Sequence, residues 1–349
     1  MTLQIGQRQI GGKSKPYIIA EMSGNHNQTI SRALEIVEAA ADAGADAVKL
    51  QTYKPETITL DSELPDFRIR DEKSIWNGET LFSLYKKAHT PWEWHAEIFS
   101  FAKSKGIECF SSPFDETAVD FLESLEVPAY KIASFENIHI PLIRRVARTG
   151  KPVIMSTGMA SLAELAEAVD ALTQEGSTDL VLLKCTSNYP SVPTDANIRT
   201  IPHMRELFNC EAGISDHTSG CGVAVAAVAL GASVVEKHLT LDRNDGGVDS
   251  TFSMEPDEFK GLVEEVAKAW SSLGEVSYGP TENELRSLKY RRSIYASTNI
   301  KRGETLSDTN IKVVRPGLGL KPKYFDFMLG KVAKEDIAKG SPLRLEDII

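Results

Sequence analysis

The sequence is most informative at residues 213–240, GISDHTSGCGVAVAAVALGASVVEKHLT. Two apolar runs flank a stretch of small residues, a pattern that predicts a strand, a loop, a helix and a second strand. The first run leads into Ser-Asp-His at 215–217, and the second ends in Glu-Lys-His at 236–238. Neighbouring parallel strands finish at the same end of a sheet, so the two histidines are predicted to lie together.

This stretch alone leaves two interpretations of the histidines open. His217 and His238 can share one divalent metal ion, with carboxylates and water in the remaining positions. Alternatively, each is an ordinary histidine at a strand end that is satisfied by a hydrogen bond. The rest of the chain favours the shared ion.

The same alternation of strand and helix runs through most of the chain. Apolar runs predict strands, and amphipathic patterns such as residues 31–43 predict helices between them. Eight such strands in about 270 residues fit a (β/α)8 TIM barrel. A doubly wound open sheet is the alternative, but it requires a GxGxxG fingerprint after the first strand, where this chain has MSGNHNQ. The predicted strands are 17–21, 47–51, 107–112, 129–134, 153–156, 180–185, 212–215 and 233–238.

Four segments lie outside this repeat. Alternating polar and apolar residues at 2–12 predict a short N-terminal β-hairpin. The polar insertion 52–80 is longer than an ordinary connection and is typical of a substrate-facing loop. After a barrel domain at 1–275, weakly patterned residues 276–290 predict a linker, and 291–349 predict a small β-rich domain.

The composition is that of a globular enzyme. The chain has 349 residues, of which 42% are hydrophobic and 25% charged. No apolar run approaches the ~20 residues that span a bilayer, and the N-terminal residues lack the apolar core of a signal peptide. The four cysteines form no CxxC pair, and the net charge of −10 argues against a nucleic-acid partner. We therefore expect a cytoplasmic protein with reduced thiols.

Polar side chains recur at the predicted strand ends. Lys49 in AVKLQ and Lys131 in AYKIAS lie within apolar strands, where a lysine is costly unless an anion pairs with it. With hydroxyls from other strands, these two lysines suit a phosphate and a carboxylate together. Some of the serines and threonines are expected only to cap a following helix. The strand-end set comprises Glu21, Lys49, Gln51, Ser111, Ser112, Lys131, Ser134, Glu136, Ser156, Thr157, Thr186, Tyr189, Ser215, His217, Glu236 and His238.

These residues belong to motifs that carry a family resemblance. The motifs, in chain order, are IIAEMSGNHNQ, AVKLQTY, SSPFD, PAYKIASFE, MSTGMAS, KCTSNYPS, GISDHTSG and VVEKHLT. Together they resemble the sialic acid synthase family almost end to end, and RPGLGL near the C-terminus resembles that family's antifreeze-like (SAF) domain. The resemblance implies condensation of phosphoenolpyruvate with an open-chain acylated amino sugar. The products would be a nine-carbon 2-keto sugar acid, a nonulosonate, and inorganic phosphate.

The resemblance also implies roles for individual residues. His217 and His238 match the family's ligands for a catalytic divalent metal, usually manganese, with magnesium or cobalt as alternatives. Glu21 matches the acid/base carboxylate. Ser187 departs from the asparagine that neuraminic acid members tend to carry, which puts a substrate contact there in doubt. The phosphoenolpyruvate contacts match Lys49, Ser112, Lys131, Ser134, Ser156 and Ser215, and the sugar contacts match Gln51, Tyr189, Glu236, Asp249 and Arg315.

Two segments concern the choice of sugar. GGVDSTFSM at 246–254 and LYKKAHTPWEWH at 84–95 resemble the pseudaminate-forming branch of the family, whose substrate is a 6-deoxy diacetamido hexose. Legionaminate or neuraminate synthesis stays open. The resemblance further implies a domain-swapped homodimer, in which Arg315 of one chain reaches the sugar in the barrel of the other.

Two other classes of function compete with this interpretation. A Schiff-base aldolase on the same barrel would use Lys49 or Lys131 as its nucleophile, but the paired histidines and the hydroxyls are superfluous to that chemistry. A non-enzymatic protein that binds ice or a glycan through its C-terminal domain would leave the polar rim of the barrel unexplained.

Overall fold

The computed structural model describes residues 2–71 and 76–349. Its contacts divide the chain into two compact units, Met1–Gly274 and Glu275–Ile349. None of the described helices is both long enough and apolar enough to cross a membrane.

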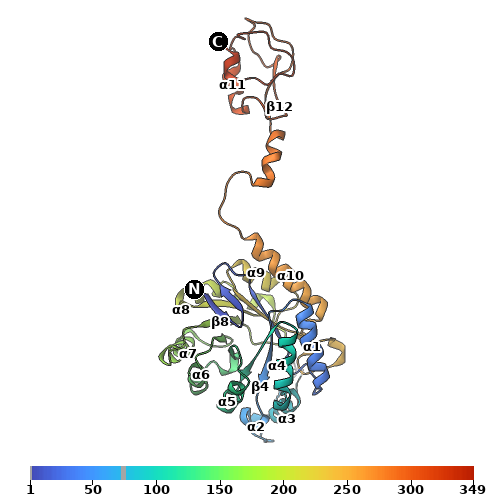
Figure 1. The fold of residues 1–349 in the computed structure, drawn as a ribbon, viewed down its shortest axis with the longest axis vertical. Helices are drawn as coiled ribbons and strands as arrows, with labels where there is room; N and C mark the ends of the chain where they lie inside the picture. The colour runs from blue at the N-terminus through green and yellow to red at the C-terminus, as the bar shows by residue number, and fades with distance from the viewer. Residues whose placement is uncertain (1, 72–75) are drawn as a thin grey trace. The chain divides into compact units, whose positions relative to one another are not determined.

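The first unit is a closed barrel of eight parallel strands, which confirms the predicted TIM barrel (Figure 1). The strands follow one another around the barrel in chain order, and β10 closes it by pairing with β3. Only the fourth predicted strand differs markedly. It ends at Ile132, because residues Ser134–Glu136 turn into a 3-10 helix (η3). The strands are β3 (Tyr17–Glu21), β4 (Ala47–Thr52), β5 (Glu108–Pro113), β6 (Tyr130–Ile132), β7 (Val153–Ser156), β8 (Leu180–Cys185), β9 (Glu211–Ser215) and β10 (Val234–His238).

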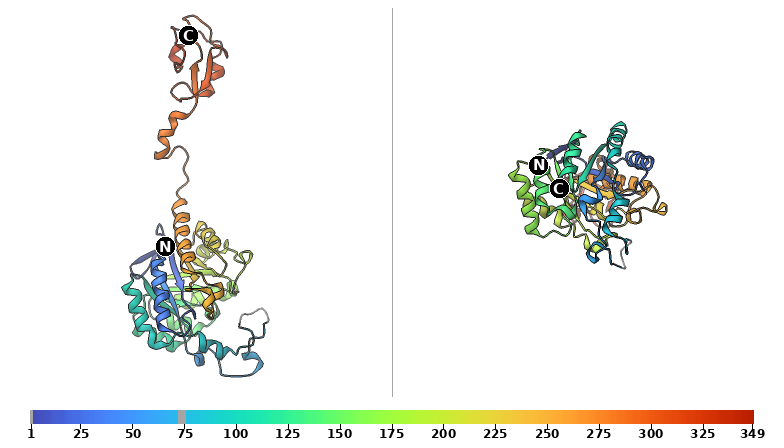
Figure 2. Two further views of the ribbon diagram at one scale, coloured as in Figure 1. Left: turned by 90° about the vertical axis from the view of Figure 1, so that its right-hand side faces the viewer. Right: turned by 90° about the horizontal axis from the view of Figure 1, so that it is seen from below.

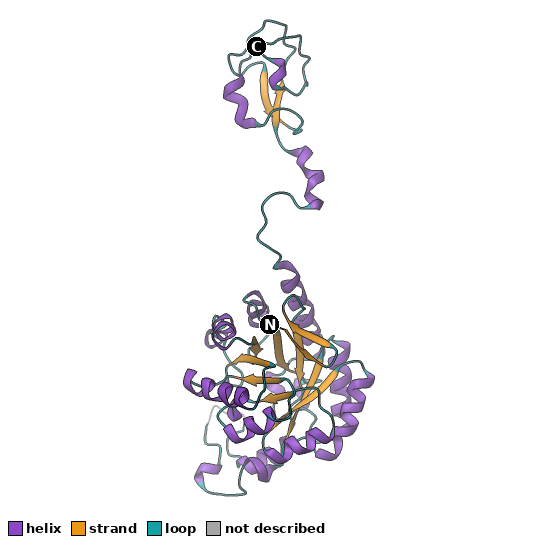
Figure 3. Ribbon diagram, turned by 60° about the vertical axis from the view of Figure 1, so that its left-hand side comes forward, coloured by secondary structure: helices purple, strands orange, loops and turns teal. Residues whose placement is uncertain are grey.

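Helices surround the strands, as the secondary-structure colouring shows (Figure 3). Helix α1 buries Ala33, Ile36, Val37 and Ala40, the spacing of one helical face. The start of α7 is set by a capping box in which Ser161 and Glu164 satisfy each other's backbone N–H groups. The helices are α1 (Ile30–Asp42), α3 (Leu81–Ala88), α4 (His95–Ser104), α5 (Glu116–Ser124), α6 (Ile140–Ala147), α7 (Leu162–Gln174), α8 (Thr200–Phe208), α9 (Gly222–Ala229) and α10 (Pro256–Ser272), with the single turn α2 (Pro55–Ile58) inside the insertion.

The predicted N-terminal hairpin forms from β1 (Thr2–Ile5) and β2 (Arg8–Gly11), which pair antiparallel. Its Ile5 and Ile10 belong to the same buried cluster as Tyr17 and Val234, which begin their strands. The hairpin therefore packs under the amino ends of the barrel strands. It lies at the opposite end of the barrel from the insertion after β4 (Figure 2). The hairpin therefore does not cover the carboxyl ends of the strands, where the polar side chains lie.

The second unit contains one antiparallel pair, β11 (Ser293–Ala296) and β12 (Ile311–Val314). The remaining β contacts are isolated bridges, and a small core forms around Ile294, Ile311 and Leu343. Within the predicted linker, Glu282–Tyr290 forms a 3-10 helix (η7) started by a capping box of Thr281 and Glu284. The other short helices are η8 (Pro322–Tyr324), α11 (Phe325–Met328) and η9 (Leu345–Asp347).

Candidate active site

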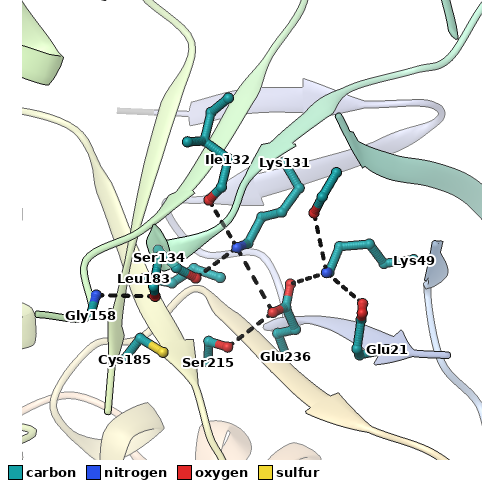
Figure 4. A network of polar contacts seen from close by, with 12 residues as sticks. Glu21, Lys49, Lys131, Ile132, Ser134, Gly158, Leu183, Cys185, Ser215 and Glu236 are labelled. Atoms are coloured by element: carbon teal, nitrogen blue, oxygen red, sulfur yellow. Dashed lines mark hydrogen bonds and ion pairs between the residues drawn. The ribbon is translucent and has the colours of Figure 1, made fainter. Parts of the chain in front are cut away.

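Two lysines and two carboxylates form a buried network at the carboxyl ends of the strands (Figure 4). The Lys49 Nζ atom lies 2.5 Å from Glu21 Oε2 and 3.9 Å from Glu236 Oε2. The Lys131 Nζ atom lies 3.9 Å from Glu236 Oε1 and donates to Ser156 Oγ at 2.7 Å. Because strands β3, β4, β6 and β10 each contribute one member, the closed barrel itself brings these charges together.

Burial changes the protonation of this network. Burial raises the pKa of Glu21 to about 7, although the Lys49 ammonium opposes the shift. Burial also acts on Glu236, but the charges of Lys131 and Lys49 prevail and hold its pKa below the usual range. Burial lowers the pKa of Lys131. Near neutral pH the site thus holds one firm anion, Glu236, and one carboxyl, Glu21, that is poised between its two forms, and both lie beside lysines that can pair with an incoming anion.

Hydroxyl groups line the wall beside Lys131. Ser134 Oγ accepts from the Gly158 N–H at 3.2 Å, and Ser215 Oγ donates to Glu236 Oε1 at 2.9 Å. A Cβ atom on Gly158 would lie 2.2 Å from Ser187 Oγ and 2.6 Å from Ser134 Oγ, so the glycine allows the two hydroxyls to converge. Ser112 Oγ lies 3.4 Å from Lys49 Nζ. The structure thus brings all six predicted phosphoenolpyruvate residues together in one buried polar cluster at the carboxyl ends of the strands.

The two predicted metal ligands lie side by side. The rings of His217 and His238 are buried, with their centroids 5.3 Å apart. His217 Nδ1 is 3.0 Å from the carbonyl oxygen of Thr186, which fixes that nitrogen as the donor and leaves Nε2 as a ligand atom. Burial lowers the pKa of His238 well below its usual value, and its Nδ1 is a buried atom without a hydrogen-bond partner.

These observations fit two neighbouring imidazoles that hold one ion. Burial opposes the protonated form of His217, but its contact with the Cys185 thiol prevails and raises the pKa of His217. Among the described residues, no three His, Cys, Asp or Glu side chains are grouped to bind a metal by themselves. An ion between the histidines would therefore take its other ligands from water or substrate, as in catalytic sites that keep open positions.

A second side of the polar cluster is formed by Gln51, Ser23 and Asp249. Gln51 Nε2 donates to Glu21 Oε1 at 2.9 Å and to Ser23 Oγ at 3.0 Å. Ser23 Oγ donates to a carboxylate oxygen of Asp249, which lies in the loop after β10. Of these three residues, only Ser23 was not predicted from the sequence; it follows Glu21 by two positions in the MSGNHNQ turn.

Aromatic side chains close this second side. Tyr189 lies 4.5 Å from the ring of His217 and 5.1 Å from that of Phe252, measured between centroids. Trp76, from the insertion after β4, lies 6.4 Å from Tyr189 and donates its Nε1–H to the carbonyl oxygen of Val248 at 2.9 Å. The insertion therefore reaches the loop after β10. Trp76 and Phe252 were not predicted as site residues, because an aromatic residue in a loop does not by itself indicate a binding site.

Arg315, the remaining predicted sugar contact, belongs to the second unit. It directly follows β12 and is exposed.

Comparison with known proteins gives a consistent result. The chain is 45% identical over 345 residues to the pseudaminic acid synthase of Campylobacter jejuni, covering 99% of both chains. It is 42% identical to that of Helicobacter pylori, over 95% of this chain and 98% of the relative. The crystal structure of the N-acetylneuraminic acid synthetase of Leptospira borgpetersenii matches with a TM-score of 0.73 at 32% identity, over 83% of this chain and 96% of that one.

Family models divide the chain in the same way. The SAF domain model matches residues 291–349, and the NeuB family model matches residues 36–278. The family predicted from the motifs is confirmed: this chain belongs to the NeuB family.

Proposed function

We propose that this protein is a pseudaminic acid synthase. It condenses phosphoenolpyruvate with an open-chain 6-deoxy diacetamido hexose and forms a nine-carbon 2-keto sugar acid and phosphate. The observation that carries this proposal is the buried pair Lys49 and Lys131, in contact with hydroxyl groups and beside a carboxyl with a pKa near neutrality. The near full-length similarity to the Campylobacter and Helicobacter synthases supports the choice of reaction.

The polar cluster suits the two anionic groups of phosphoenolpyruvate. Lys131 already donates to the Ser156 hydroxyl, and both groups can donate to an anion. The N–H of Gly158 lies close to the hydroxyls of Ser134 and Ser187. An anion that enters between Lys131 and Lys49 replaces the distant Glu236 contacts of 3.9 Å with direct charge-assisted hydrogen bonds. The two lysines thus exchange their distant contacts with the Glu236 carboxylate for direct contacts with the substrate.

Glu21 is the acid/base group of the proposed reaction. C3 of phosphoenolpyruvate attacks the aldehyde carbon, and water adds at C2. One proton of this water ends on the former aldehyde oxygen, which becomes a hydroxyl, and the other ends on the departing phosphate. The C2–O bond to phosphate then breaks, so the bridging oxygen leaves with phosphate and the 2-keto group remains. A carboxyl with a pKa of about 7 can both take and return a proton at neutral pH, which suits control of this water.

The proposal includes a divalent metal, Mn2+ or alternatively Mg2+ or Co2+, held by His217 and His238. When bound, it supplies Lewis-acid polarisation of the sugar aldehyde. The protein's contribution is to keep both imidazoles buried and neighbouring, with His217 oriented by the Thr186 carbonyl. Titration with Mn2+, followed by electron paramagnetic resonance, should give one site per chain that is lost in His217→Ala and His238→Ala.

The proposal also includes a homodimer in which Arg315 of one chain completes the sugar site of the other. Large apolar side chains are exposed on each unit, as expected of surfaces that a partner covers. They are Phe135, Ile138, Met159 and Leu162 after β6 and β7, and Val314 and Leu318 beside Arg315. Subunit exchange between Arg315→Ala and Glu21→Gln proteins should restore some activity. Exchanged dimers without recovery would contradict the shared site.

A cytoplasmic location is proposed as well, because the four cysteines are free thiols, the form typical of reducing compartments. Cell fractionation tests this location.

One experiment tests the reaction and the choice of sugar. The protein is incubated with phosphoenolpyruvate and Mn2+ and with the diacetamido hexoses of the pseudaminate and legionaminate types or N-acetylmannosamine, while phosphate release is followed. We expect the pseudaminate precursor to give the highest kcat/KM by orders of magnitude. A preference for another sugar would support legionaminate or neuraminate synthesis instead. Release with none of them, or trapping of pyruvate by borohydride, would contradict the synthase.

A further inference from the structure

Ser23 has an unusual backbone conformation at the edge of the site. It follows β3 by two residues, it is 2% exposed, and its φ is +48°. Residues other than glycine rarely adopt this left-handed region, because the Cβ atom crowds the backbone. Such strain persists where the surroundings enforce it, and it is concentrated at functional sites. A serine at a position that glycine would adopt more easily therefore indicates that its side chain has a role there.

The strained turn aims two donors at one carboxylate. The Ser23 hydroxyl and the backbone N–H of Gly24 both donate to Asp249, which is itself 9% exposed. Ser23 Oγ also accepts from Gln51 Nε2 at 3.0 Å. One hydroxyl thus joins three segments that are remote in sequence, namely the turn after β3, strand β4 and the loop after β10.

This junction sets how Gln51 faces the polar cluster. One amide hydrogen of Gln51 goes to Glu21 Oε1 at 2.9 Å and the other to Ser23, so the carbonyl oxygen is left as an oriented acceptor. Asp249, held by two donors, likewise keeps lone pairs for a ligand. Two fixed acceptors recognise hydroxyl or amide N–H donors, the groups that an acetamido sugar carries.

The turn also holds the loop 246–254. Asn27 Nδ2 donates to the Gly246 carbonyl oxygen at 2.6 Å, and Asn25 Nδ2 donates to Ser253 Oγ at 2.8 Å. A Cβ atom on Gly247 would lie 2.9 Å from Asn27 Oδ1, so the turn and the loop are in close contact. The orientation of Asp249 is therefore tied to the turn at both ends.

We propose that Ser23 is a positioning residue that determines sugar specificity: its hydroxyl fixes Gln51 and Asp249 as paired acceptors for the hydroxyl and acetamido groups of the acceptor sugar. This inference rests on the proposed function, since it assigns the Gln51 side of the polar cluster to the sugar. It adds a residue that contacts neither the phosphoenolpyruvate lysines nor the histidines in any hydrogen bond between described residues.

Two substitutions separate the hydroxyl from the strain. Ser23→Ala keeps the Cβ atom and removes the hydroxyl, whereas Ser23→Gly removes both. In each, we expect KM for the sugar to rise about 10- to 100-fold and KM for phosphoenolpyruvate to stay within about twofold, because only the sugar loses oriented acceptors. The preference for the diacetamido hexose over N-acetylmannosamine should fall about tenfold or more, since hydrogen-bonded sites discriminate strongly.

Glu126→Gly is the matched control, because Glu126 is also left-handed, with φ +55°, but is exposed in the loop before β6. It should relieve the same kind of backbone strain without removing a buried hydroxyl, and it should leave both KM values unchanged. Unchanged sugar KM in both Ser23 variants, or an equal rise in both KM values, would overturn the inference. The measurements use whichever sugar the wild type turns over best. A wild type that prefers another sugar therefore refutes the proposed function, while the Ser23 result is still read separately.

Discussion

Strand β10 carries buried charges on both of its faces, and these charges belong to two groups that are built differently. Side chains alternate along a strand, so Glu236 faces the polar cluster and Asp216 and Lys237 face the surrounding helices. We call Glu21, Lys49, Lys131 and Glu236 the inner cluster, and Asp216 with Lys237 the outer pair. Both groups are almost completely buried.

The outer pair is fully matched, and the inner cluster is not. Lys237 Nζ lies 2.8 Å from Asp216 Oδ2 and donates to the Thr218 carbonyl oxygen at 2.5 Å. Asp216 Oδ1 accepts from both the N–H and the hydroxyl of Thr218. In contrast, Glu236 Oε2 is buried without a hydrogen bond. The fully hydrogen-bonded outer pair is suited to a structural role, since it joins the strand ends that carry His217 and His238. The incomplete cluster leaves capacity for a ligand.

The largest effect on activity is expected from the inner cluster. Glu21→Gln should lower kcat about 10²- to 10⁴-fold, because a positioned acid/base group contributes on that scale. KM for both substrates should change little, and the midpoint of urea unfolding should not fall. Steady-state phosphate release and urea titration measure these quantities. A kcat within threefold of the wild-type value would show that Glu21 is not the acid/base group.

The outer pair should show the opposite balance. Lys237→Met leaves the Asp216 carboxylate buried and unpaired, which should lower the free energy of unfolding by about 3–5 kcal/mol. The double variant Asp216→Asn/Lys237→Met should recover part of this loss, because no uncompensated charge remains. Lys131→Met, with a similar change of shape in the inner cluster, serves as the matched control and should lose phosphoenolpyruvate binding instead. If both lysine substitutions lowered the free energy of unfolding equally, the inner cluster and the outer pair would not differ in the way proposed.

The pH dependence of stability provides a smaller test, through Glu136 on the rim. Burial raises the pKa of Glu136 from 4.5 to about 7, although Lys131 and Lys49 oppose the shift. The folded state then binds the proton more tightly than the unfolded state, so this stability is fully present below pH ~4.5 and is lost as pH rises to about 7. Glu136→Gln should therefore become more stable than wild type across this window, by at most roughly 3 kcal/mol at pH 8. Unfolding at pH 4 and pH 8 measures the difference, and a gap that does not grow with pH would contradict the raised pKa.

The contrast also shows what local sequence could predict. Strand positions and the polar residues at their ends were readable, because the period of a strand and its termination are local properties. The early end of β6 was missed, since Ser134 leaves the strand and accepts a hydrogen bond from Gly158 in the turn after β7. The Ser23 turn and the aromatic side chains of Trp76 and Phe252 were missed, because each depends on segments that meet only in the folded barrel. Side chains that alternate along an extended chain also imply that Asp216 and His217 point to opposite sides, but this consequence was not part of the prediction from the sequence.

The smallest expected effect concerns Ser187, where the sequence departs from the asparagine of neuraminic acid members. Its hydroxyl lies against Gly158, close enough that a Cβ atom there would be 2.2 Å away, and 3.8 Å from Cys185 Sγ. It therefore faces the phosphoenolpyruvate wall and not the sugar side. Ser187→Ala should raise KM for phosphoenolpyruvate about two- to fivefold, on the order of one neutral hydrogen bond, and leave sugar KM unchanged. Ser187→Asn tests whether the larger amide takes over that contact, in which case KM stays near the wild-type value. A change confined to sugar KM would place Ser187 on the sugar side of the polar cluster.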